Sequence, residues 1–477
     1  MNPSLENLYR RLPMPAQNLA LSMYGRIWRG RRLGGDFDRI TADFRERDYW
    51  APERMRAYVQ ARLRRALTHA YDQVPYYRER WGAAGIERGD LVRMTTDDLP
   101  RLPITPKEDL RRDSLAFVAG DAPLKRLHSY PTSGSSGTPV VVRYPTEAHR
   151  GFIAAREARS FGWAGVSVRM PRSTLGGRLV VPPENPRPPY YRYNAAEKHV
   201  YLSAFFISRE TAPSYVEGLN RYRPLTLTGY AHAHYALARF MLDRGLRLDY
   251  QPRALILGSE KLTPEMQSLV EEAFRARVFE EYGAAENCVL ATACQEGRLH
   301  LNVDFGYAEI IDERGQPAPP GRPGRLVCTG FMNDAQPLIR YEIGDSAAWS
   351  RESCACGRDQ LPVIEELLGR VEDVAYCPDG RAVSILHSLF VNLPVIEEAQ
   401  IVQERLDLFR IRVVAGPNFG SIEEAEIRRR LLQRVGEVRV EFERPDRIER
   451  TLRGKFKVFV SNLTEEEKRR AGALEAN

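Results

Sequence analysis

The sequence lacks the long apolar stretches that a membrane-spanning helix requires. No run of about 18 apolar residues occurs in its 477 residues, so we expect no membrane span. The first residues, MNPSLENLYRRLP, include an early acidic residue and contain neither the apolar core nor the small-residue cleavage site of a secretion signal. These absences predict a cytoplasmic protein.

Cysteine is scarce, and neither sign of charge dominates. Six cysteines in a chain of this length do not indicate a small secreted protein held by disulfides. Basic residues number 70 and acidic residues 63, which gives a formal net charge of +7 that is spread along the chain. This small excess favours an ordinary solvated surface without a nucleic-acid partner. The alternative is affinity for polyanions or for a membrane surface.

The length predicts two or more domains, and a hydrophobic content of 43% predicts that they are folded. Residues 1–95 are expected to be mainly helical, because apolar residues recur at helical spacing within residues 55–71. Short β-branched runs then alternate with helical stretches, which is typical of α/β layers. The pattern changes after residue 368, where residues 383–392 are expected to form a helix among strands. We therefore predict an α/β protein with a large multi-layer N-terminal domain, residues 1–368, and a small α+β C-terminal domain, residues 369–477.

One N-terminal segment has two interpretations. Residues 19–28 are amphipathic and lead into the basic run RGRRLGG. A helix packed on the protein itself is the favoured interpretation, and contact with a membrane surface is the alternative.

Small hydroxyl residues and glycines fill the stretch between Pro131 and the strand-like run Val140–Val142. Glycines let successive backbone N–H groups converge on an anion, and the hydroxyls add donors, so this loop suits phosphate oxygens. A surface linker is the alternative. The chain contains no GxxxxGK[ST] motif, and Thr138 replaces the second glycine of a GxSxG elbow. The candidate phosphate-binding residues are Thr132, Ser133, Gly134, Ser135, Ser136, Gly137 and Thr138.

Five motifs in order make the sequence similar to a known superfamily. They are TSGSSGTP (132–139), EYGAAE (281–286), RYEIGD (340–345), GRVED (369–373) and RGKFK (453–457). Together they resemble the motifs of the adenylate-forming superfamily of acyl-CoA synthetases, adenylation domains and luciferases. Within it, Val140 after the loop and the short C-terminal unit resemble the phenylacetate–CoA ligase branch. The stretch LPMPAQNLALSMYG is also similar to ligase-like proteins encoded in capsule gene clusters.

The resemblance implies a nucleotide site for ATP and Mg²⁺. The 132–138 loop would hold the terminal phosphates and Glu286 the Mg²⁺, while Tyr282 would lie against adenine. Asp345 would accept from the ribose hydroxyls with help from Arg370. Other implied nucleotide contacts are Gly258, Ser259, Glu260, Glu281 and Gly283. Ala285 departs from the usual threonine of this pattern.

The resemblance also implies a mobile C-terminal domain that turns about a hinge at Glu372 and Asp373. Glu372 replaces the usual aspartate. Lys455 would reach the reacting carboxylate and α-phosphate during adenylation, so Lys455, Glu286 and Arg370 are the catalytic candidates.

Cysteine and histidine recur as Cys294-x5-His300 and Cys354-x-Cys356. Three thiolates and an imidazole suit a tetrahedral structural Zn²⁺. The C-x-C spacing is tighter than the common zinc spacing, so four unrelated residues are the alternative. Branches of the resembling family carry a similar C-x5-H and C-x-C-G-R arrangement.

The acid-binding pocket is the least defined part of the site. Tyr230, His232 and His234 lie where the resembling family lines it, although they equally fit ordinary core and surface positions. We predict ATP-dependent formation of an acyl-adenylate from a carboxylic acid, with coenzyme A as the default acceptor. The alternatives are transfer to an amine or hydroxyl, and a nucleotide-binding protein without catalysis. A homodimer is a family-level expectation.

Overall fold

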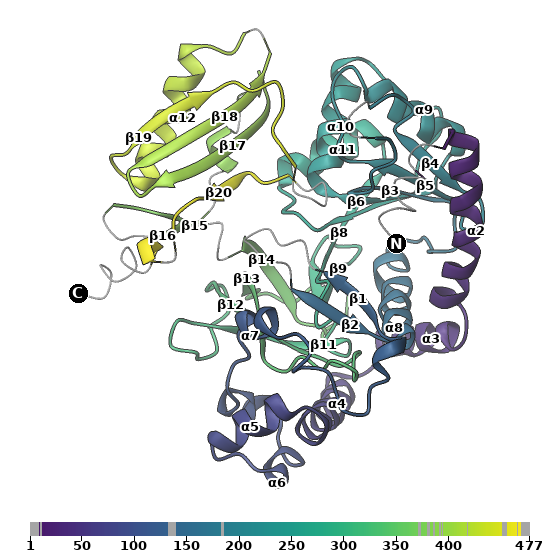
Figure 1. The fold of residues 1–477 in the computed structure, drawn as a ribbon, viewed down its shortest axis with the longest axis vertical. Coiled ribbons are helices and arrows are strands. Elements are labelled where there is room, and N and C mark those ends of the chain that lie inside the picture. Colours follow the sequence, from purple (N-terminus) through teal and green to yellow (C-terminus); the bar gives the residue numbers. More distant parts are fainter. Residues whose placement is uncertain are drawn as a thin grey trace. The chain divides into compact units, whose positions relative to one another are not determined.

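Figure 1 shows the computed structural model of the chain, which divides into two compact units, Met1–Leu367 and Leu368–Asn477. The structure describes residues 9, 12–131, 140–182, 186–370, 374–378, 382–384, 387–390, 393, 395–416, 418–450, 456–464 and 466–468. Among these residues, no helix is long and apolar enough to cross a membrane.

The first unit begins with helices, as the apolar spacing predicts. The longest, α4, buries Met55, Val59, Leu63 and Leu67 on one face, because residues three or four apart share a side of a helix. Short 3₁₀ turns connect this region to the sheets at Thr96–Arg101 and Leu124–Arg126. The helices are α2 (Met14–Leu33), α3 (Phe37–Arg47), α4 (Pro52–Gln73), α5 (Pro75–Ala83), α6 (Arg88–Leu91) and α7 (Lys107–Arg112).

A twelve-stranded sheet forms the centre of the first unit, in the order β11-β12-β13-β14-β10-β9-β8-β7-β6-β3-β5-β4. Strands β5, β3, β6, β7 and β8 pair in parallel. The bounds are β3 (Arg172–Gly176), β4 (Tyr191–Asn194), β5 (His199–Ser203), β6 (Thr226–Tyr230), β7 (Ala254–Gly258), β8 (Arg277–Gly283), β9 (Leu290–Ala293), β10 (Leu299–Leu301), β11 (Gly306–Ile311), β12 (Gly324–Gly330), β13 (Tyr341–Trp349) and β14 (Val363–Arg370).

Helices cover both faces of the parallel strands. In β7, Leu255 and Leu257 pack with α9 (Ala212–Tyr222), α10 (Ala231–Asp243) and α11 (Pro264–Phe274). The alternate residues Ala254 and Ile256 pack on the other face. There they meet α3, α8 (Thr146–Arg156) and the π-helical turn η3 (Glu157–Phe161). Successive side chains of a strand point to opposite faces, so one buried run serves two layers. The predicted α/β class is confirmed.

The second unit is a small α+β domain with its own core. Its sheet has the order β19-β18-β17-β20, and α12 contributes Ile427 and Leu431 to a core shared with Phe409 and Ile411. The predicted helix at 383–392 is wrong for the residues that the structure describes there: Val383 pairs with Ala375 in a two-stranded sheet, and His387–Phe390 forms a 3₁₀ turn. The bounds are β15 (Val374–Tyr376), β16 (Ala382–Ser384), β17 (Ile396–Arg405), β18 (Leu408–Ala415), α12 (Ser421–Val435), β19 (Arg439–Glu443) and β20 (Phe459–Ser461).

Candidate active site

A cavity of about 360 Å³ opens where the parallel strands of the first unit end. Open α/β sheets bind ligands at this carboxyl edge, because loops and helix starts gather there. Strands and their ends supply Thr174, Thr228, Gly229, Tyr230, Ile256, Gly258, Ser259, Glu281 and Gly283, and the turn after β8 supplies Ala284, Ala285 and Asn287. Strand β2 (Val141–Tyr144) and helix α8 supply Tyr144, His149, Phe152 and Arg156.

The backbone of these strand ends depends on glycine at two positions. A Cβ on Gly229 would lie 2.0 Å from the carbonyl oxygen of Leu175, and one on Gly258 would lie 2.1 Å from that of Glu281. Ser259 follows with a left-handed φ of 67°, which few residues with a side chain adopt. Four of the predicted nucleotide residues, Gly258, Ser259, Glu281 and Gly283, line this one cavity.

Two further predicted nucleotide residues meet across the sheet. The hydroxyl of Tyr282 on β8 donates to Oδ2 of Asp345 on β13 over 2.6 Å. Burial raises the pKa of Tyr282 well above its usual value, and the Asp345 charge raises it further. The phenol therefore remains a donor at neutral pH and fixes the orientation of the Asp345 carboxylate.

Glu286 is buried beside a cation that the sequence does not single out. The Lys107 Nζ lies 3.9 Å from its Oε1 and donates to the carbonyl of Ile343 over 2.8 Å. The hydroxyl of Tyr341 is 3.4 Å from the same carboxylate oxygen. Ala285 and Asn287, which flank Glu286 in the chain, line the cavity, but Glu286 itself does not. Its charge is thus compensated within the protein.

Glu281 and Glu260 are positioned by neighbours. Arg156 on α8 donates from Nε to Oε2 of Glu281 over 2.8 Å. Oε2 of Glu260 accepts the backbone N–H of His232 at 2.9 Å. Both contacts fix carboxylates beside the strand ends.

Of the three predicted acid-pocket residues, only Tyr230 lines the cavity. The His232 Nδ1 lies 3.6 Å from Glu260. His234 is buried in α10, where its ring contacts Phe274 and its Nδ1 lies 2.9 Å from the carbonyl of Tyr230. Burial lowers the pKa of His234 to about 4, so this imidazole is neutral and belongs to the core.

Sequence analysis missed the side of the cavity formed by β2 and α8. No sequence motif includes the four residues of this side, which are Tyr144, His149, Phe152 and Arg156. They reach the site because β2 and α8 pack beside the strand ends. Burial lowers the pKa of His149 to about 4, with the positive charge of Arg32 as a further cause, so its imidazole is neutral.

Several predicted residues lie outside the described part of the chain. These are the 132–138 loop, Glu372, Asp373 and Lys455, and for Arg370 only the backbone is described. The strands that flank the loop, β1 (His128–Pro131) and β2, pair antiparallel, with Pro131 opposite Val141.

The four predicted metal ligands come together in the first unit. Cys294 and His300 belong to the β9–β10 hairpin, and Cys354 and Cys356 precede β14. Their ligand atoms all lie within 4.8 Å of one another. The Sγ atoms of Cys294 and Cys354 are 3.6 Å apart, and the Cys356 Sγ is 3.3 Å from the His300 Nε2. Sulfur ligands at tetrahedral angles around zinc are about 3.8 Å apart, so the set fits this ion.

His300 is oriented by a contact outside the cluster. Its Nδ1 lies 2.8 Å from the carbonyl oxygen of Leu361. A donor N–H at Nδ1 leaves the lone pair of Nε2 toward the three sulfurs, which is the arrangement of metal-binding histidines.

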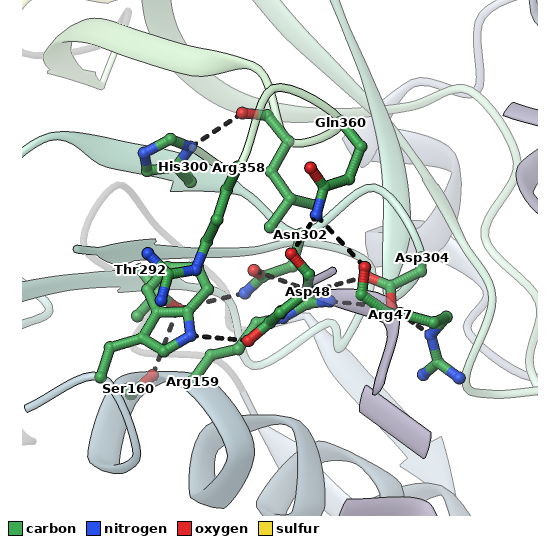
Figure 2. Close-up of polar contacts among 12 residues, drawn as sticks. Arg47, Asp48, Arg159, Ser160, Thr292, His300, Asn302, Asp304, Arg358 and Gln360 are labelled. Carbon is green, nitrogen blue, oxygen red and sulfur yellow. Dashed lines mark hydrogen bonds and ion pairs between the residues drawn. The ribbon is translucent and has the colours of Figure 1, made fainter. Parts of the chain in front are cut away.

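A buried charged network lies next to this cluster (Figure 2). Arg159 on η3 contacts Oδ1 of Asp48 at 2.7 Å and Oδ1 of Asp304 at 2.6 Å. The amide of Gln360, between the cysteines and β14, donates to the carbonyl of Asp48 over 2.6 Å. The network therefore joins the end of α3, the turn η3 and the metal-cluster loop.

Comparison with known proteins finds similarity to CapK and to coenzyme A ligases. The family model of the CapK C-terminal domain matches residues 376–462. The chain is 26% identical over 414 residues to protein CapK of Staphylococcus aureus, covering 84% of this chain and 87% of that protein. It is 28% identical over 392 residues to a phenylacetate–coenzyme A ligase of Thermus thermophilus, covering 78% and 84%. The structure resembles 2-hydroxyisobutyryl-CoA ligase in its postadenylation state, with a TM-score of 0.67, 21% identity and coverage of 90% and 94%. This structural likeness shows a shared fold.

Proposed function

Because the chain is a homologue of CapK and of phenylacetate–coenzyme A ligases and has the fold of an adenylate-forming ligase, we propose that it activates a carboxylic acid with ATP and transfers the acyl group to coenzyme A. The observation that carries the proposal is the composition of the cavity. Residues expected to hold the nucleotide, Gly258, Ser259, Glu281 and Gly283, line it together with Tyr230, which is expected to face the acid.

The proposed reaction has two steps. A carboxylate oxygen attacks the α-phosphorus of ATP, the bond to the bridging oxygen breaks, and pyrophosphate leaves. The thiolate of coenzyme A then attacks the acyl carbon, and AMP leaves with the bonding electrons. Both steps need fixed reactants and donors placed where charge develops.

The described residues support the nucleotide half of this site. Asp345 would accept from the ribose hydroxyls in the orientation that Tyr282 imposes over 2.6 Å. Arg156 holds Glu281 at the strand edge. Glu286 would hold the Mg²⁺ that accompanies ATP, with Lys107 compensating its charge in the free protein. Arg370, Lys455 and the 132–138 loop keep the roles that the family resemblance implies.

We also propose one structural zinc ion per chain, bound by Cys294, His300, Cys354 and Cys356. The mutual distances within 4.8 Å and the oriented His300 ring support this assignment. The ion would connect the β9–β10 hairpin to the segment that leads into β14. It would lie in the structural framework and take no part in the two chemical steps.

A pyrophosphate-release assay with a panel of carboxylic acids tests the activity. We expect ATP-dependent release with at least one acid, and loss of release in the Asp345→Ala variant. Products formed with coenzyme A, an amine or a hydroxyl acceptor would then identify the second step. No release with any acid, despite tight ATP binding, would instead favour a non-catalytic nucleotide-binding protein. The cytoplasmic location and the homodimer remain predictions.

A further inference from the structure

Helix α2 has one face fixed to the sheet, and its other face is exposed within the part of the chain that the structure describes. Its Asn18 and Ser22 side chains accept the backbone N–H groups of Tyr193 and Ala195 in and after β4. A Cβ on Gly25 would lie 2.4 Å from the Asn194 amide, so the helix lies close against this edge. Figure 1 shows α2 running alongside β4 and β5.

The opposite face carries a continuous apolar stripe. Leu19, Met23 and Ile27 are 63%, 65% and 59% exposed, and they recur at intervals of four residues. Tyr24 beside them is 51% exposed. Single exposed apolar residues are ordinary, but an aligned row on one helix marks an interaction surface.

The charges of α2 indicate what covers this stripe. The helix contains four arginines and no acidic residue. At 100° per residue, Arg26 lies at one edge of the stripe and Arg31 at the other, and both are exposed. An apolar helix face bordered by arginines is complementary to a lipid surface with anionic headgroups. A second copy of the same helix would instead bring arginines against arginines.

We propose that the outer face of α2 docks the protein on the surface of an anionic lipid bilayer. Leu19, Met23 and Ile27 would enter the boundary between headgroups and acyl chains, while Arg26 and Arg31 contact the headgroups. The inner contacts with β4 hold the helix in the plane of the docking surface.

Co-sedimentation with vesicles tests this proposal. The full-length protein should bind vesicles of phosphatidylcholine with 30% phosphatidylglycerol, about tenfold more strongly than pure phosphatidylcholine, and lose binding at high salt. Met23→Ser with Ile27→Ser should abolish binding. Leu242→Ser with Ile422→Ser, two exposed apolar residues elsewhere, should leave it unchanged.

Three results would overturn the proposal. They are equal binding to both vesicles, unchanged binding by the Met23 and Ile27 variant, and absence of binding. A wild-type dimer that becomes monomeric in the same variant, measured by light scattering, would assign the stripe to self-association.

A second, independent observation concerns Asn287 in the cavity. Its side chain is 4% exposed, its φ is 57°, and it lines the cavity next to Ala285. Neither its Oδ1 nor its Nδ2 has a hydrogen-bond partner within the described part of the chain. A buried amide without hydrogen-bond partners lowers the stability of the fold. Because Asn287 lines a binding cavity, a bound ligand that hydrogen-bonds to its amide would explain this cost.

The cavity around Asn287 combines apolar and polar walls. Phe152 and Ile256 are apolar, whereas the hydroxyls of Thr174 and Thr228 lie 2.8 Å from each other. Resting on the proposed function, we infer that the acid carries a hydroxyl or amide group, which Asn287 binds through its free amide. Asn287 is then a specificity-determining residue.

Matched acids test this inference by pyrophosphate exchange. The probes are 2-hydroxyisobutyrate with pivalate, and 4-hydroxyphenylacetate with 4-methylphenylacetate, which differ by a hydroxyl in place of a methyl group. Wild type should favour a hydroxyl acid by at least about tenfold in kcat/KM. Asn287→Leu should reduce that ratio to near one without changing the Kd for ATP.

The outcomes separate this inference from the function on which it rests. No exchange with any acid removes both. Exchange with the same preference in Asn287→Leu, or with no preference in wild type, removes only the assignment of Asn287. A weaker Kd for ATP with an unchanged preference would place the amide on the nucleotide.

Discussion

At the scale of single residues, the contact between Tyr282 and Asp345 joins two motifs through residues that lie 63 positions apart in the sequence. Tyr282→Phe keeps the ring and removes the donor that orients the carboxylate. A hydrogen bond to a charged group contributes about 1.5–3 kcal/mol, so we expect ATP to bind about tenfold or more weakly, measured by calorimetry.

Tyr250→Phe is the matched control, because its buried hydroxyl has no partner in the described part of the chain. It should leave ATP affinity unchanged. Equal ATP affinity in Tyr282→Phe and wild type would contradict the orienting role.

A second residue-scale prediction concerns Arg159, which is fully buried between Asp48 and Asp304. Arg159→Met fits the space but leaves two buried carboxylates short of their partner. Breaking a buried ion pair from one side costs about 3–5 kcal/mol, so the urea midpoint of the first unit should fall strongly at pH 7.

This loss should depend on pH. Burial alone would raise the pKa of Asp304, but the charges of Arg159 and Arg47 hold it below its usual value. A carboxylate with a lowered folded-state pKa contributes stability above its unfolded pKa of about 4, and this contribution disappears as the pH falls further. The difference between wild type and Arg159→Met should therefore shrink below pH 4, and a constant difference would contradict this account.

The site residues also show what a sequence can reveal. Tyr282 and Asp345 were candidates because they belong to quoted motifs, whereas Gly258 and Ser259 were implied by the family resemblance alone. Asn287 follows such a motif directly, and the lack of a hydrogen-bond partner for its amide among the described residues is visible only once the surrounding side chains are placed. Lys107 and Arg156 belong to helices whose approach to the strand edge depends on contacts distant in sequence.

At the scale of elements, strands and helices with strong local signals were predictable. The predicted alternation of β-branched runs and helical stretches corresponds to elements such as β7 and α11, and Thr263 caps α11 by accepting the N–H of Met266. The helix expected at 383–392 failed because strand pairing with β15 outweighs local helical spacing there. The apolar stripe on α2 was visible in the sequence as amphipathicity. The exposure of this face within the described part of the chain could be recognised only from the packed structure.

The zinc assignment makes a prediction at this scale, because the ion would join one hairpin to one loop. Protein purified without added metal should contain about one zinc per chain. Cys354→Ser with Cys356→Ser should lose the metal and lower the melting temperature, since two of four ligands disappear. Elemental analysis and thermal unfolding measure both effects.

Cys377→Ser offers the control, because this buried cysteine lies in the second unit and outside the cluster. It should retain the zinc. A zinc content near zero in wild type would remove the assignment.

At the scale of the whole molecule, the chain has two units with separate cores. Among the described residues, the core of the second unit runs from Ala375 to Phe459. The sequence analysis predicts a change of character after residue 368, because the α/β alternation ends there. The family resemblance implies that the second unit turns about Glu372 and Asp373 between the two half-reactions, so the two steps should respond differently to changes in that unit.

Lys455→Ala and Glu372→Pro separate these steps. In the adenylation pose the Lys455 ammonium would stabilise the charge that builds between carboxylate and α-phosphate, so its loss should slow pyrophosphate exchange about a hundredfold or more. Acyl transfer from a supplied acyl-adenylate should remain nearly unchanged. Glu372→Pro restricts the hinge backbone and should spare exchange while slowing transfer. A wild-type rate of pyrophosphate exchange in Lys455→Ala would contradict the role assigned to this lysine. Equal slowing of both steps would contradict the two orientations of the second unit, because a lysine that acts in only one orientation affects only one step.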